Sequence, residues 1–224
     1  MTLSQKKRAT LVTLLVVAFL VLDQAVKIYI KTHFCLNESY HVWGDWFQLY
    51  FLENEGMAFG MSFGGDTGKL ILSVFRIILS IGIIYYIHKI NKRPETPTGV
   101  LIGLSFVLVG AIGNILDSAF YGLIFSESGI ASPAVLFPPE GGYSSFLHGK
   151  VVDMFYFPII DTVLPANFPI WGGRHVVFFQ FIFNVADACI TCGALYLLFF
   201  QYRFFSGNEG KPRKESKPQR TGSK

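Results

Sequence analysis

Charged side chains are scarce in this sequence of 224 residues. Asp, Glu, Lys and Arg make up 15% of it, whereas hydrophobic residues make up 51%, and the mean hydropathy is +0.44. This composition excludes an ordinary soluble domain and indicates an integral membrane protein. The formal net charge is +4, but the basic residues flank apolar runs instead of forming patches interleaved with aromatics, so we predict no nucleic-acid binding.

Cysteine is also scarce. The three cysteines are Cys35, Cys189 and Cys192, an odd number, and two of them lie inside an apolar run, so a disulfide framework is excluded. Cys189 and Cys192 have Cys-x-x-Cys spacing, but no thioredoxin-like strand and helix pattern surrounds them. We interpret them as small residues that pack one helix against another.

Several well-known catalytic motifs are missing. The chain has no Gly-x-Ser-x-Gly, no His-Glu-x-x-His and no phosphate-binding Gly-x-x-x-x-Gly-Lys-Ser/Thr, which argues against the hydrolases and nucleotide-binding proteins that use them. The histidines are scattered over loops and the ends of apolar runs: His33, His41, His88, His148 and His175. We therefore predict neither a metal site nor another cofactor.

Long apolar runs are abundant. We predict membrane-spanning helices over about residues 9–31, 70–88, 100–123 and 176–202, since a bilayer needs roughly 20 residues. The first run could be a cleaved signal peptide, but it exceeds a signal core, lacks a small-x-small cleavage site and contains Asp23 and Lys27. The prediction is an all-α membrane protein with a four-helix domain over 1–206 and a disordered basic tail over 207–224.

Positive charge predicts the orientation of these helices. Basic residues gather before the first run, between the second and third, and after the fourth: Lys6, Lys7 and Arg8; Lys89, Lys92 and Arg93; Arg203 and six more up to Lys224. With four spans, the positive-inside rule places all three groups in the cytoplasm. Both termini are then cytoplasmic, and the two long connections face outward.

The two outer segments differ in composition. Residues 46–52 are rich in aromatics and precede several glycines, so we predict a small antiparallel sheet that rests on the membrane. Residues 154–171 are apolar but contain Pro158, Pro165 and Pro169. Because proline interrupts helices, we interpret this piece as interfacial or re-entrant and not as a further span.

Polar side chains interrupt the apolar runs in a pattern that predicts one site. Asp23 and Lys27, Asn114 and Asp117, and Asn184 and Asp187 are each spaced to share a helix face, and Asp153 lies in a separate apolar stretch. Burying such groups in hydrocarbon costs several kcal/mol, so they need polar partners. We expect them to line a common site that opens near the outer membrane surface.

The residues alone leave the function open. Two carboxylates close together in a dry site cannot both ionise easily, so one can hold a proton while the other acts as a base, which is aspartic protease chemistry. Intramembrane carboxylates also build proton or ion pathways in transporters. In a third interpretation, the polar groups only bind the helices to one another.

Five motifs resemble those of one known family, and they occur in the same order. They are Asp23-Gln24-x-x-Lys27, Asn54-x-Gly56-x-Ala58-Phe59-Gly60, Gly110-x-x-Gly113-Asn114-x-x-Asp117, Val151-Val152-Asp153 and Phe183-Asn184-x-Ala186-Asp187. The chain resembles the bacterial lipoprotein signal peptidases, or signal peptidase II, over about residues 10–202.

The resemblance implies an aspartic endopeptidase of the bacterial inner membrane. It would cut diacylglyceryl-modified prolipoproteins just before the modified cysteine, with membrane lipid around it and no nucleic-acid partner. The family's catalytic aspartates fall on Asp153 and Asp187. The residues that line or support the site fall on Asp23, Lys27, Asn54, Gly56, Asn114, Asp117 and Asn184. Lys27 could instead extend to the interface and Gly56 could only permit a turn.

The sequence departs from the family pattern in two places. Family members commonly have Arg after the aspartate that matches Asp117, and here the residue is Ser118. The connections on either side of Asp153, residues 119–150 and 154–175, are also longer than usual. We predict that Arg174, Arg76 or Lys150 replaces the missing arginine.

Overall fold

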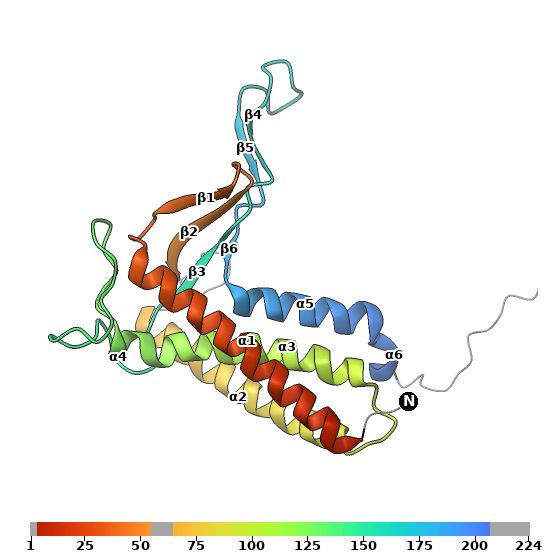
Figure 1. Cartoon of the computed structure of the whole chain (residues 1–224). Helices are drawn as coiled ribbons and strands as arrows, with labels where there is room; N and C mark the ends of the chain where they lie inside the picture. Colours follow the sequence, from red (N-terminus) through yellow and green to blue (C-terminus); the bar gives the residue numbers. More distant parts are fainter. Residues whose placement is uncertain (1–3, 55–64, 207–224) are drawn as a thin grey trace, which may run out of the picture.

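Within residues 4–54 and 65–206, which it describes, the computed structural model contains four long helices, three short helical segments, a four-stranded sheet and a two-stranded sheet (Figure 1). The helices are α1 (Gln5–His33), α2 (Gly65–Asn91), α3 (Thr98–Leu116), the π-helical turn η1 (Asp117–Tyr121), α4 (Gly122–Ile124), α5 (Val185–Phe200) and α6 (Tyr202–Phe205). The strands are β1 (Ser39–Trp43), β2 (Phe47–Asn54), β3 (Val151–Tyr156), β4 (Ile160–Val163), β5 (His175–Phe178) and β6 (Ile182–Phe183).

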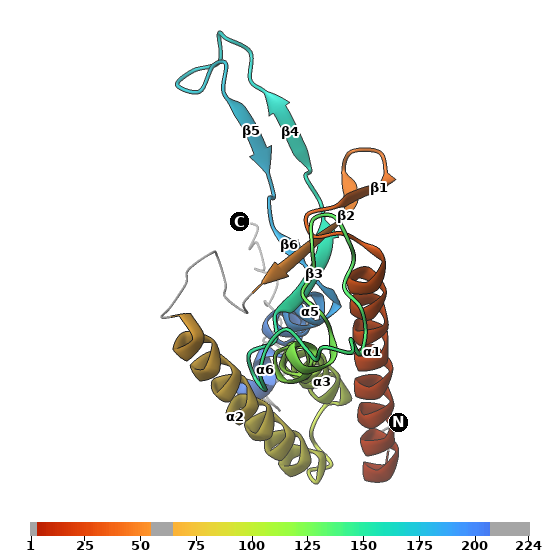
Figure 2. The same ribbon diagram turned by 90° about the vertical axis from the view of Figure 1, so that its left-hand side faces the viewer.

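The central helix of the bundle is α3, which packs against α1, α2 and α5 (Figures 1 and 2). Glycines allow its contact with α5 to be close. A Cβ atom on Gly110 would lie 2.2 Å from the carbonyl oxygen of Ala186, and one on Gly113 would lie 3.0 Å from the Cβ atom of Ala186. Small residues of this kind drive helix association in membranes, where the hydrophobic effect gives no preference for helix contact over lipid.

Three helices within the described residues are long and apolar enough to cross a membrane: Gln5–His33, Thr67–Asn91 and Thr98–Ile124. They correspond to the first three predicted spans and extend a few residues beyond them. The predicted helix over 176–202 is wrong at its start, because α5 begins only at Val185. Residues 175–178 and 182–183 form strands, and Asn184 caps the helix.

The predicted small sheet is confirmed, and it is larger than the sequence indicated. Its antiparallel strands lie in the order β1-β2-β3-β6, so the second outer segment contributes β3 and β6. In this register Leu52 lies opposite Asp153, and Phe155 lies opposite Phe183. A buried cluster that includes Ile30, Phe51 and Met154 joins the sheet to α1. The sheet therefore holds Asp153 at one end of the helix bundle.

The segment predicted to be interfacial or re-entrant contains a strand. Residues of β4 pair with β5 from Ile160↔Phe178 to Val163↔His175, and the hairpin extends away from the helices (Figures 1 and 2). The segment is therefore a β-hairpin, and its interfacial or re-entrant placement in the membrane stays a prediction. The prolines that suggested it lie outside the paired residues, Pro158 before β4 and Pro165 and Pro169 in the connection to β5, where no ladder hydrogen bond is lost.

Candidate active site

Asp153 and Asp187 meet where the sheet joins α5. Asn184 is the N-cap of α5: its Oδ1 accepts a hydrogen bond from the Asp187 N–H at 2.9 Å, and its own N–H donates to Asp187 Oδ2 at 3.3 Å. This capping box fixes Asp187 in the first turn of the helix. The other end of the same amide, Asn184 Nδ2, donates to Asp153 Oδ1 at 2.7 Å. One residue therefore positions both aspartates.

Two further amides complete the hydrogen bonding of the pair. Asn114 Nδ2, from α3, donates to Asp187 Oδ1 at 2.9 Å, and Asn54 Nδ2, from β2, donates to Asp153 Oδ2 at 3.3 Å. Asn114 Oδ1 also accepts from Asn184 Nδ2 at 3.3 Å. The three asparagines thus form a connected network that limits the rotation of both carboxyl groups.

The two aspartates have different surroundings. Asp153 is only 3% exposed, and burial, with a further contribution from the charge of Asp187, raises the pKa of its carboxyl to about 7. Asp187 is partly exposed. Near neutral pH, such a pair can hold one proton on Asp153 while Asp187 accepts another from a reactant. The arrangement is suited to general acid and base catalysis.

A buried ion cluster lies next to the pair. Lys27 Nζ lies 2.8 Å from Asp117 Oδ2 and 3.0 Å from Asp23 Oδ2, and it donates to Asn114 Oδ1 at 3.0 Å. Lys27, Asp23 and Asp117 are inaccessible to solvent. Lys27 therefore points into the protein and does not extend to the membrane surface.

The carboxylates of this cluster hold the two segments that carry the aspartate pair. Asp23 Oδ1 accepts from the N–H of Ala186, the neighbour of Asp187, at 2.9 Å. Asp117 Oδ2 accepts from the N–H of Val152, the neighbour of Asp153, at 3.3 Å. Lys27 binds both acceptors, so it links the position of β3 to that of α5.

Gln24 also belongs to the site, although it was not among the predicted site residues. Gln24 Nε2 donates to Asp23 Oδ2 at 3.0 Å and to Asp117 Oδ1 at 2.9 Å, and its Oε1 accepts from the Tyr121 hydroxyl at 3.1 Å. Gln24 stands inside the Asp23-Gln24-x-x-Lys27 motif, which was the available signal. Gly56 lies outside the described residues.

A second buried lysine supports the strand that carries Asn54. Lys31, one turn beyond Lys27, pairs with Glu53 and donates to Ser128 Oγ at 2.8 Å. Ser128 belongs to the long segment between α4 and β3, and its hydroxyl donates to Glu53 at 2.7 Å. One role of that insertion is therefore to hold β2 next to α1.

The three candidates for the missing arginine have different environments. Ser118 Oγ donates to the carbonyl of Asn114 at 3.0 Å and brings no charge to the site. Lys150 Nζ lies 3.6 Å from Glu53 and 3.4 Å from Glu127, and Arg174 is exposed near the end of the hairpin. Arg76, partly buried on α2, interacts electrostatically with Asp187, Asp117 and Asp153. The charge of Arg76 therefore acts on the aspartate pair.

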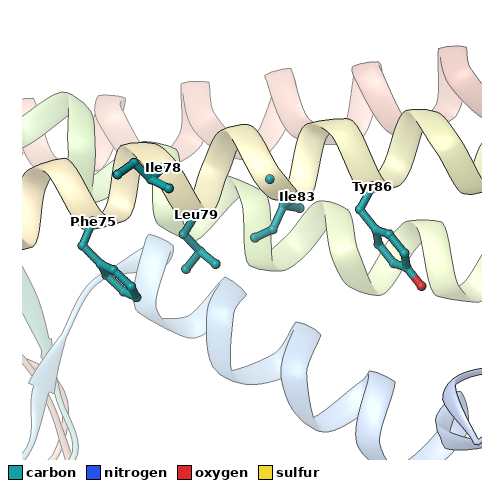
Figure 3. A pocket seen from close by; sticks show the side chains of 6 residues that line it. Phe75, Ile78, Leu79, Ile83 and Tyr86 are labelled. Carbon is teal, nitrogen blue, oxygen red and sulfur yellow. The ribbon is translucent and has the colours of Figure 1, made fainter.

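An apolar cavity of about 420 Å³ lies beside α2. One of its lining residues, Phe75, is the sequence neighbour of Arg76. Its lining residues are Phe75, Ile78, Leu79, Gly82, Ile83 and Tyr86. The side chains of Phe75, Leu79 and Tyr86 point to the side of α2 on which α5 lies (Figure 3). The lining residues follow α2 from Phe75 to Tyr86.

Comparisons with known proteins identify the family. A profile of signal peptidase (SPase) II matches residues 15–203. The chain belongs to the signal peptidase II family. It is 47% identical over 196 residues to the lipoprotein signal peptidase of Porphyromonas gingivalis, covering 88% of this chain and 84% of that protein. It is 34% identical to the lipoprotein signal peptidase of Amoebophilus asiaticus, covering 77% and 70% of the two chains.

Solved structures have a similar fold. A bacterial membrane enzyme determined by the in meso method at 2.3 Å resolution matches with a TM-score of 0.59 and 21% identity, over 92% of this chain and 95% of that one. A second, at 1.9 Å, matches with a TM-score of 0.54 and 22% identity, over 84% and 90%. The family assignment favours the peptidase among the functions that the residues left open, because the chain belongs to a family of signal peptidases and these relatives are lipoprotein signal peptidases.

Proposed function

We propose that this protein is an aspartic endopeptidase in which Asp153 and Asp187 form the catalytic pair, and that it cuts prolipoproteins just before the diacylglyceryl-modified cysteine. The observation that carries the proposal is the shared positioning of two carboxyl groups by Asn184, with the buried one having its pKa raised to about 7. Asp23, Lys27, Asn54, Gly56, Asn114, Asp117 and Asn184 are the supporting residues, and no metal or other cofactor takes part.

The reaction needs two proton movements. Asp187 takes a proton from water as the water oxygen attacks the carbonyl carbon of the scissile peptide bond, while the protonated Asp153 donates a hydrogen bond to the carbonyl oxygen. In the tetrahedral intermediate that forms, the nitrogen then takes a proton from the pair as the C–N bond breaks. One proton remains on the pair, which is thereby restored.

The apolar cavity beside α2 is the place we assign to the signal helix of the substrate. Its lining by Phe75, Leu79 and Ile83 is apolar, as contact with an apolar helix requires, and Phe75 adjoins Arg76, which interacts electrostatically with both aspartates. The diacylglyceryl chain would stay in lipid while the cysteine that carries it is held at the site, so lipid attachment contributes positioning.

The proposed setting is the bacterial inner membrane, with four spans and both termini in the cytoplasm. The start of α1 and the helix α6 lie at one end of the bundle, and the sheet lies at the other (Figure 1). Arg8 and Arg203 therefore lie far from the aspartate pair, as expected when positive charge is cytoplasmic and the site is near the periplasmic face.

The decisive experiment compares cleavage by the wild type with cleavage by Asp153→Asn, Asp187→Asn and the double variant. Purified protein in detergent and lipid is incubated with a diacylglyceryl-modified prolipoprotein or with its unmodified form. Asn keeps the shape of Asp but cannot accept the proton of water, so each single change should abolish turnover. Because the two residues act as a unit, the double variant should be scarcely worse than either single variant.

The matched control is Asp45→Asn, at a side chain that is 98% exposed in the turn between β1 and β2. It should cleave at the wild-type rate. Activity that survives in Asp153→Asn or Asp187→Asn would refute the pair, and equal cleavage of the unmodified precursor would refute the requirement for the lipid.

A further inference from the structure

We infer that the hairpin of residues 158–181, which contains β4 and β5, is a membrane-contacting element that lies in the lipid headgroup region on the same side as the aspartate pair. The lipid contact is independent of the proposed function. Its consequence for catalysis, given below, rests on that function.

The composition of the hairpin is the first observation. Asp161 and Arg174 are its only fully charged residues, and most of the others are apolar or aromatic. Large apolar side chains are exposed along its length, among them Ile159, Ile160, Val163, Phe168, Trp171, Phe178 and Phe181, and Ile170 is 91% exposed. Apolar surface of this extent marks an interaction site, and a two-stranded hairpin alone in water is only marginally stable.

The exposed groups lie on both faces of the hairpin. Ile160 and Val163 are three residues apart in one strand, so they point to opposite faces. His175 and Phe178 have the same relation in β5, and both are exposed. A flat protein partner would cover one face only, whereas a layer of lipid headgroups surrounds an inserted hairpin on both faces. This distribution favours lipid over a second copy of the chain.

The position of the hairpin is the second observation. It leads through β6 and the cap Asn184 directly into α5, so it leaves the bundle where that helix begins. It then runs across the axes of α3 and α5 and not along them (Figures 1 and 2). If α5 crosses the membrane, a segment with this direction lies along the membrane surface at the depth of the helix end.

The residues near the turn of the hairpin are of the types that favour the lipid headgroup region. Trp171 is exposed beside Arg174 and His175. Tryptophan is enriched at membrane interfaces because its ring is apolar and its N–H is polar, and a nearby cation can attract anionic headgroups. The hairpin also connects β3, which carries Asp153, to α5, which carries Asp187. Its contact with lipid would fix the depth of the pair relative to the surface where the lipid-modified cysteine emerges.

Tryptophan fluorescence tests the inference directly, because the chain has three tryptophans, Trp43, Trp46 and Trp171. The double variant Trp43→Phe/Trp46→Phe retains Trp171 as its only tryptophan. The full chain is reconstituted into phosphatidylcholine and phosphatidylglycerol vesicles whose acyl chains are brominated near the headgroup or near the chain end. We expect blue-shifted emission, weak quenching by aqueous acrylamide, and stronger quenching by the shallow bromines than by the deep ones.

The matched control carries Trp171→Phe and Glu140→Trp on the same background. Glu140 is exposed in the other outer segment, between α4 and β3, and its tryptophan should be quenched by acrylamide and not by lipid. Three results at Trp171 would overturn the inference. Strong acrylamide quenching means an aqueous hairpin, preferential quenching by deep bromines means insertion into the core, and protection from both quenchers means coverage by protein.

Discussion

Asp153 is the buried member of the aspartate pair. Burial raises the pKa of Asp153 to about 7, and the charge of Asp187 adds to the effect. If Asp153 must be protonated when water attacks, the active fraction of the enzyme falls as the pH rises through about 7. We therefore expect kcat/KM to decline tenfold per pH unit on the alkaline side, with an apparent pKa that belongs to the coupled pair.

A variant of Asn54 tests the sign of this dependence. The hydrogen bond that Asn54 donates stabilises the ionised form of Asp153 and lowers its pKa. Removing the donor in Asn54→Ala should raise that pKa and move the alkaline limb to higher pH, even though the maximal rate falls. The measurement is the profile of kcat/KM between about pH 5 and pH 9. A limb that moves to lower pH, or does not move, would show that another group controls it.

Arg76 is the residue that we expect to act in place of the missing family arginine. It interacts electrostatically with Asp187, Asp117 and Asp153. Arg76→Gln should lower kcat/KM on the order of tenfold, the loss expected for one charge-assisted contact, and Arg76→Lys should restore part of it. Arg174→Gln and Lys150→Gln are the controls. If all three glutamine variants cleave at the wild-type rate, no residue of this set replaces the arginine.

At the scale of elements, the start of α5 combines two roles in Asn184 that a substitution can separate. Its Oδ1 caps the helix, and its Nδ2 holds Asp153. Asn184→Ser keeps a good capping oxygen but removes the donor, so thermal stability should stay near the wild type while kcat falls by on the order of 100-fold from misplacement of the pair. Asn184→Ala should lose the cap as well, at about 1 kcal/mol. If Asn184→Ser and Asn184→Ala were both as active as the wild type, the only role of Asn184 would be to cap α5.

The bounds of the helices could be predicted from the sequence better than those of the strands. Hydropathy located α1, α2 and α3, because long apolar helices leave a signal that does not depend on tertiary contacts. It placed the start of the fourth helix too early, since β5 and β6 are as apolar as the helix that follows them. Asn184 followed three residues later by Asp187 is a capping-box pattern that marks the true start. The sequence does not reveal β4, because prolines that flank a strand leave the same pattern as prolines that interrupt a single apolar segment.

At the scale of the whole molecule, buried polar and charged residues connect the helices at both ends of the bundle. At the sheet end, the motif residues predicted from spacing and family resemblance come together, except Gly56, which lies outside the described residues. Their partner groups, such as the backbone N–H groups of Val152 and Ala186, could not be predicted, since only the fold brings them close.

At the opposite end of the bundle, the sequence indicates for Arg8 only a role in setting the membrane topology. It is buried, and its guanidinium donates to the carbonyls of Asn91 and Thr96 at 2.7 and 2.9 Å.

The number of membrane crossings is the remaining property of the whole molecule that can be tested. The helix α5 has 16 residues, fewer than the roughly 20 that usually cross a bilayer, although α6 and its aromatic residues follow directly. We nevertheless predict four crossings, because positive charge gathers at both termini and after α2. A reporter that is active only in the cytoplasm should therefore work when fused after Lys92 and after Arg203. It should be inactive when fused after Gly141, between α4 and β3. Activity after Lys92 combined with inactivity after Arg203 would mean that α5 does not cross, and that the chain has three spans with its carboxyl terminus outside.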